Sequence, residues 1–95
     1  MSSNQVISRL FGENLKRQRK LAGLTQDELA VMASVHRTEI SQLERGLRVC
    51  RIDTLIKLAS CLEISPEKLL EGISWRPGEV AIGRFRMTED EPESS

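Results

Sequence analysis

Apolar residues recur at helical spacing along most of the chain. Between Ile7 and Ala22 they return every three or four positions, and the pattern stops at the next glycine, which predicts one amphipathic helix. Thr25 and Glu28 then have the spacing of a capping box, in which each side chain accepts a hydrogen bond from the other residue's backbone amide. The sequence therefore predicts a second, short helix over residues 26–33.

A short polar break at Ser34 and His36 separates the second helix from a third, predicted over residues 37–45. Gly46 ends this third helix, because glycine readily adopts the left-handed conformation of a helix C-terminus. The chain thus contains two short helices joined by a tight turn.

Two further helices are predicted before the pattern changes. The fourth carries one apolar stripe at helical spacing: Ile52, Leu55, Ile56, Ala59 and Leu62. Ser65 as N-cap and Pro66 as first helical residue begin a fifth helix, which bears Leu69 and Leu70 and ends at Gly72. The expected fold is all-α, with five helices over residues 1–72.

The chain changes character after Gly72. Residues 73–87 contain one proline, two glycines and spaced apolar residues, which favour an extended segment. Residues 88–95 carry four acids and no base and are expected to be disordered. The apolar residues suit a dimerisation arm: Trp75, Val80, Ile82, Phe85 and Met87. Packing on their own domain and binding to another protein remain the alternatives.

Composition narrows the function classes. The chain has 95 residues with 14 basic and 14 acidic side chains, yet residues 1–51 hold nine bases against five acids. His36 is the only histidine and the two cysteines lack metal-ligand spacing, so we expect no metal, no cofactor and no enzymatic activity. The short apolar runs predict neither a membrane span nor a secretion signal, so a cytoplasmic protein is expected.

The third predicted helix carries the candidate chemistry. One arc of its helical wheel is polar or basic throughout: Arg37, Thr38, Ser41, Gln42 and Arg45. Ile40 and Leu43 lie on the opposite side, so the apolar side can dock while the arc faces outward. Arginine can bind guanine bidentately and glutamine can bind adenine, which favours a helix that reads the major groove of DNA. An ordinary solvated face is the alternative for each residue taken alone.

Two segments, GLTQDELA at residues 23–30 and ISQLERG at residues 40–46, resemble the Cro/CI-type helix-turn-helix family, also called the xenobiotic response element family. The similarity extends from about Leu10 to Leu70 and does not reach beyond Gly72. It implies a five-helix, lambda-repressor-like domain of a prokaryotic or phage regulator that acts at the nucleoid.

The resemblance also implies roles for individual residues. Arg37, Thr38 and Gln42 match positions that contact bases. Backbone contacts are implied or suggested for the remaining polar positions: Gln26, His36, Ser41, Arg45, Arg48 and Arg51. Arg19 and Glu44 match an internal salt bridge that ties the third helix to the domain.

Three positions depart from the family pattern. His36 stands where Ser or Thr commonly caps the third helix, and Ser34 replaces the glycine common in the turn, which suggests that the turn does not strictly need a left-handed residue. Cys50 replaces a frequent proline. An inert thiol is the favoured interpretation, with a redox switch as the alternative.

The sequence thus predicts a DNA-binding transcriptional regulator, expected to be a repressor that binds a palindromic operator on double-stranded DNA as a homodimer. The alternative is an antitoxin-like or anti-regulator module whose residues 73–95 bind a protein partner.

Overall fold

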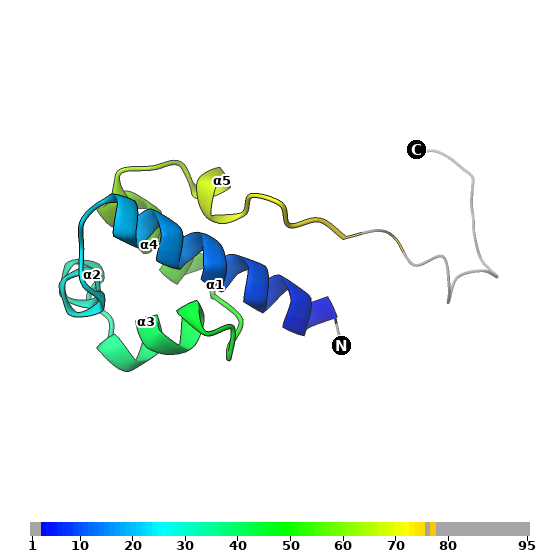
Figure 1. Cartoon of the computed structure of the whole chain (residues 1–95), viewed down its shortest axis with the longest axis horizontal. Coiled ribbons are helices and arrows are strands. Elements are labelled where there is room, and N and C mark those ends of the chain that lie inside the picture. The colour runs from blue at the N-terminus through cyan, green and yellow to red at the C-terminus, as the bar shows by residue number, and fades with distance from the viewer. Residues whose placement is uncertain (1–2, 76, 78–95) are drawn as a thin grey trace.

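The computed structural model describes residues 3–75 and 77, and this part of the chain folds into five helices without a strand. The helices are α1 (Ser3–Leu21), α2 (Gln26–Ala33), α3 (Arg37–Glu44), α4 (Ile52–Leu62) and α5 (Pro66–Leu69). The long α1 runs through the domain, with α3 on one side of it and α5 on the other (Figure 1). The expected all-α, five-helix fold is confirmed.

Every helix contributes to a single core. The largest side chains with almost no exposure come from all five: Leu15, Leu29, Ile40, Leu43, Leu58 and Leu69. Phe11 of α1 and three alanines fill the space between them. The core sits where α1, α3 and α5 meet α2 and α4, so the orientation of α3 depends on all the other helices.

The start of α2 follows the capping box predicted from Thr25 and Glu28. The backbone amide of Glu28 donates to the Thr25 hydroxyl at 3.0 Å, and the Thr25 amide donates to the Glu28 carboxylate at 2.8 Å. Two amides that the helix itself leaves without a partner are thereby satisfied. The predicted bounds of α2 are confirmed, and its buried residues are Leu29, Ala30 and Ala33.

The turn between α2 and α3 corrects one expectation. Ser34 adopts the left-handed conformation, with φ of 58° and ψ of 44°, and its amide closes the end of α2 on the carbonyls of Ala30 and Val31. The tight turn therefore does need a left-handed residue, and here a serine accepts the steric cost that a glycine would avoid. His36 occupies the N-cap of α3, but its side chain makes no capping hydrogen bond.

The apolar stripe assigned to α4 is partly wrong. Ile52 and Ile56 are 78% and 49% exposed, whereas Thr54 and Leu58 are buried. Because α4 carries apolar residues on more than one side, its hydrophobic pattern could not decide which side packs against α2 and α5. The fifth helix was expected to end at Gly72 but ends at Leu69, and Leu70 after it is exposed.

A glycine in the middle of α1 lets α1 and α3 approach closely. A Cβ atom placed on Gly12 would lie 2.4 Å from the carbonyl oxygen of Leu43 and 2.7 Å from that of Glu44. No side chain fits there without moving the backbone of α3. Gly12 therefore sets the distance between α1 and the last turn of α3.

Asn14, two residues farther along α1 and on the other side of the helix, attaches α5 to α1. Its amide nitrogen donates to the backbone carbonyls of Leu69 and Glu71 at 3.0 and 2.9 Å, and its amide oxygen accepts from Arg17. The side chain is buried, and both ends of the amide have partners. One face of α1 thus fixes α3 through Gly12, and another fixes α5 through Asn14.

Gly12→Ala is expected to destabilise the domain by about 2 kcal/mol, because relief of the contact with α3 outweighs the better helix propensity of alanine. Urea unfolding monitored by circular dichroism measures the change. Gly23→Ala is the control, since that glycine has positive φ but open space around it, and its cost reflects backbone strain alone. Wild-type or higher stability of Gly12→Ala would contradict the role of the close approach.

Candidate DNA-binding interface

The polar arc of α3 is presented by a helix whose other side is anchored in the core. Ile40 and Leu43 are almost completely buried, and α3 contacts both α1 and α2. Arg37, Thr38 and Arg45 are exposed, while Ser41 and Gln42 are half-buried. The side chains expected to touch DNA therefore lie on the part of α3 that faces away from the core.

A buried ion pair fixes the last turn of α3 to α1. The guanidinium of Arg19 donates from Nε to Oε2 of Glu44 at 2.6 Å and from Nη2 to Oε1 at 3.0 Å. Its third nitrogen, Nη1, donates to the backbone carbonyl of Leu24 at 2.8 Å. The side chains are only 10% and 3% exposed. The hydrogen bond with Glu44 raises the pKa of Arg19, against the opposing effect of burial.

Gln26, expected to bind a phosphate, joins this ion pair. Its amide nitrogen donates to Oε1 of Glu44 at 3.0 Å. Because a carboxylate only accepts hydrogen bonds, the nitrogen must face Glu44, and one of its two N–H groups remains available for another acceptor. Gln26 also lines an open hollow of about 370 Å³, whose charged lining residues are Arg19, Lys20, Asp27 and Arg37. Basic side chains therefore outnumber acidic ones around it.

Arg37 at the start of α3 has a partner that the sequence reasoning missed. Its Nε lies 3.2 Å from a carboxylate oxygen of Asp27 on α2, and both side chains are more than half exposed. An exposed pair of this kind contributes at most about 1 kcal/mol. The pairing therefore positions Arg37 without preventing a stronger acceptor from displacing Asp27.

The loop after α3 brings Arg48 back to the polar arc. Arg48 donates from Nη1 to the amide oxygen of Gln42 at 3.0 Å. Arg51, farther along the loop, instead pairs with Asp53 at 3.3 Å and is exposed. The loop arginines thus differ, because only Arg48 contacts a residue of α3.

Cys50 in the same loop has the properties of an unreactive thiol. Burial, followed by the charges of Glu39 and Asp53, raises its pKa to about 11. The reactive thiolate is therefore scarce near neutral pH, which weakens the redox alternative for this residue. Both Cys50 and Cys61 are free cysteines.

Most of the expected dimerisation arm lies outside the described residues. Val80, Ile82, Phe85 and Met87 belong to that part, and only Trp75 is described, with 63% of its surface exposed. No group of three metal-ligating side chains occurs within residues 3–75, and no helix there is long and apolar enough to cross a membrane.

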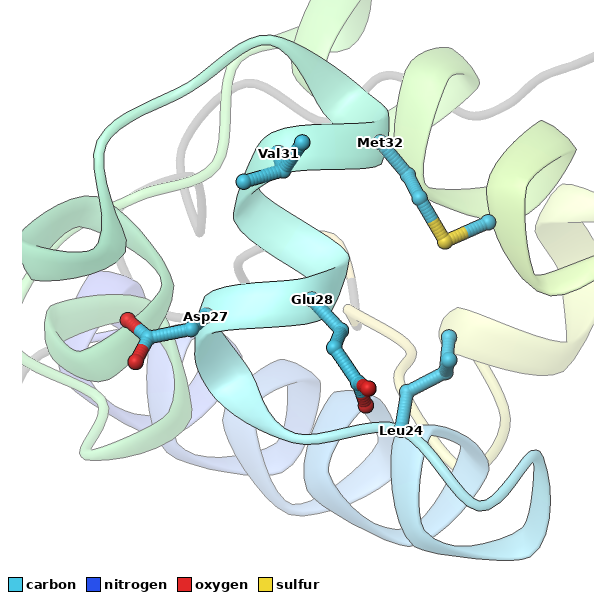
Figure 2. Close-up of a pocket in the computed structure, with 5 residues that line it drawn as sticks. All are labelled: Leu24, Asp27, Glu28, Val31 and Met32. Carbon is cyan, nitrogen blue, oxygen red and sulfur yellow. The ribbon is translucent and has the colours of Figure 1, made fainter.

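A second surface feature lies on the outer side of α2. An open hollow of about 410 Å³ there has mainly apolar walls and is lined by Leu24, Asp27, Glu28, Val31 and Met32. Leu24, Glu28 and Met32 point to one side of α2, whereas Asp27 points to the other (Figure 2). Because Asp27 also lines this hollow, the hollow adjoins the Asp27–Arg37 pair at the edge of α2.

The fold and the arrangement of α2, turn and α3 define a helix-turn-helix DNA-binding domain. The chain belongs to the helix-turn-helix family, whose model matches residues 15–69. It is a DNA-binding transcriptional regulator and not an enzyme, as the sequence predicted.

Relatives and solved structures agree with this membership. The chain is 39% identical over 64 residues to the control protein C.SmaI of Serratia marcescens, which covers 67% of this chain and 76% of that protein. It is 35% identical over 66 residues to the control protein C.BamHI of Bacillus amyloliquefaciens, covering 68% and 82%. The restriction-modification controller protein C.AhdI of Aeromonas hydrophila superposes with a TM-score of 0.64 at 34% identity, over 65% of this chain and 94% of that chain.

Removal of Glu44 tests the ion pair. Glu44→Ala is expected to lower the free energy of unfolding by about 3 kcal/mol, because the guanidinium of Arg19 is left buried without a counter-charge. Chemical unfolding provides the measurement. Glu13→Ala is the matched control, since Glu13 forms an exposed ion pair with Arg9 on α1, and we expect a loss below about 1 kcal/mol. Equal losses in the two variants would show that the buried pair is not structurally important.

Proposed function

We propose that this regulator binds a palindromic operator as a homodimer and represses transcription by occluding promoter DNA. The observation that carries the proposal is the outward arc of α3, which holds basic and amide side chains without an acid, on a helix whose inner side is locked into the core. A helix with this division of residues fits the major groove of B-DNA.

The residues divide by their position on α3 and around it. Arg37, Thr38 and Gln42 are proposed to contact base edges, because they occupy the exposed or half-exposed arc. Contacts with the DNA backbone are proposed for the other two residues of the arc, Ser41 and Arg45, and for three residues outside it: Gln26, His36 and Arg51. The available N–H group of Gln26 and the positive end of the α2 dipole both favour a phosphate there.

Dimerisation follows from the need for two half-sites about 34 to 36 Å apart. Exposed apolar side chains in the second half of the domain supply a candidate surface. Val49 and Leu70 line a cavity of about 80 Å³ with Leu55 and Ile73, and Ile52 and Trp75 are even more exposed. We propose that this surface, together with the apolar residues of segment 73–87, forms the contact between two copies of the chain.

The relatives suggest which genes are controlled. C.AhdI is a restriction-modification controller protein, and C.SmaI and C.BamHI are control proteins. We propose that this chain likewise controls genes of a restriction-modification system. It would do so in the cytoplasm of a prokaryotic host, at the nucleoid. The second candidate function is binding of a protein partner through the C-terminal segment. One structural relative was solved in complex with another protein, as the SinR protein/SinI protein complex, with a TM-score of 0.63, 33% identity and coverage of 65% of this chain and 61% of that chain.

Selection of DNA fragments by the purified protein at about 150 mM salt, where nonspecific phosphate binding is weak, tests the function. Wild type is expected to enrich a palindromic motif, and the double variant Arg37→Ala, Gln42→Ala is expected to lose it while keeping its helical circular dichroism. Lys57→Ala, which removes one exposed charge from α4, is the control and should retain the motif. Failure of the folded wild-type protein to enrich any motif would argue against autonomous operator binding and favour the second candidate.

Sedimentation velocity tests the dimer surface. Ile52→Lys is expected to shift the protein from dimer to monomer at micromolar concentration, because a charge would be buried in an apolar contact. Val31→Lys changes an equally exposed side chain on α2 and should leave the dimer intact. A wild-type monomer at operator-binding concentrations, or an unaffected Ile52→Lys dimer, would contradict this surface.

A further inference from the structure

The hydrogen bond between Arg48 and Gln42 determines which atoms Gln42 can offer to DNA. The two side chains meet at 3.0 Å. Arginine has only donors, so the amide atom that faces Arg48 must be the oxygen, and the amide nitrogen of Gln42 points elsewhere. The pairing thus gives the amide of Gln42 a defined orientation before any DNA is bound.

The backbone after α3 places Arg48 at this position. Gly46 adopts a left-handed φ of 72°, and the amide of Leu47 donates back to the carbonyl of Gln42 at 2.9 Å. A Cβ atom on Gly46 would lie 3.0 Å from the Cα atom of Arg9, so the turn also packs tightly on α1. The hydrogen bond to α3 and the packing on α1 both fix this turn. Arg48 is therefore held beside the last turns of α3.

We propose that Arg48 and Gln42 read DNA as one unit that selects guanine, and that Arg48 is a specificity-determining residue. This inference rests on the proposed insertion of α3 into the major groove. With its oxygen engaged by Arg48, Gln42 presents N–H donors, and the other N–H groups of Arg48 lie next to them. Guanine offers two acceptors in the major groove, N7 and O6, and therefore matches a set of donors.

Adenine matches the paired side chains less well. Bidentate binding of adenine requires the Gln42 oxygen to accept from the N6 amino group while the Gln42 nitrogen donates to N7. The position of Arg48 beside that oxygen places a cation where the amino group of adenine would have to approach. Without Arg48 the amide can turn freely, and adenine becomes an acceptable base. The same glutamine therefore has a different base preference depending on a residue six positions later.

Selection from a duplex library with a randomised central segment tests this proposal, followed by dissociation constants for the selected site and for each single-base change. The proteins are wild type, Arg48→Ala, Gln42→Ala and the double variant. Arg51→Ala is the matched control, because it removes the same charge from the same loop without touching Gln42. Circular dichroism verifies that each variant is folded, as expected because Arg48 and Arg51 are exposed and Gln42 is only half-buried.

We expect wild type to select guanine at one position of each half-site and Gln42→Ala to lose that preference. Arg48→Ala should reduce the preference for guanine over adenine there about tenfold or more, a size typical of a good bidentate contact. The double variant should discriminate between guanine and adenine at least as well as Gln42→Ala does. No further loss is expected because the two residues act together. Arg51→Ala should weaken binding to all sequences by a similar factor.

Two results would overturn the proposal while leaving the regulator function intact. One is a wild-type motif with adenine at the position that depends on Gln42. The other is an Arg48→Ala variant that, like Arg51→Ala, weakens binding to every sequence equally. A folded wild-type protein that selects no motif at all would overturn the proposed operator binding itself, and the guanine preference with it.

Discussion

The orientation of the DNA-reading helix depends on one buried ion pair. Arg19 and Glu44 connect α1 to the last turn of α3, while Gln26 and the carbonyl of Leu24 attach the start of α2 to the same pair. Burying two charges is costly unless their hydrogen bonds are complete, and here every guanidinium nitrogen and both carboxylate oxygens have partners. Gly12 makes the arrangement possible, because only a glycine allows the backbone of α3 so close to α1.

The bounds of α2, and those of α3 to within one residue, could be predicted because local chemistry specifies them. Thr25 and Glu28 satisfy the first amides of α2, and Gly46 can adopt the backbone angles that end α3. Local sequence signals did not predict those features that tertiary packing determines. Ser34 is left-handed although serine has no intrinsic preference for that conformation, and the exposure of Ile52 follows from which side of α4 meets its neighbours. Both outcomes depend on the tertiary arrangement.

The candidate site could be predicted as a set of residues but not as a set of contacts. Helical periodicity alone separates the polar arc of α3 from its buried side, so the arc was found without a structure. The pairing of Arg37 with Asp27 depends on the angle between α2 and α3, and the pairing of Arg48 with Gln42 depends on the course of a turn. Neither angle nor course can be read from spacing in the sequence.

The contacts of the polar arc differ from one end of α3 to the other. At the start of the helix, Arg37 is paired with an exposed carboxylate, whose attraction is weak because water screens both charges. At the end of the helix, Glu44 is buried, and the turn that carries Arg48 packs against α1. A DNA phosphate or base can therefore replace Asp27 at little cost, whereas the end of α3 cannot rearrange without disturbing the core. Adaptability at Arg37 thus coexists with a fixed geometry at Gln42, and sequence discrimination by α3 should depend most on its rigid end.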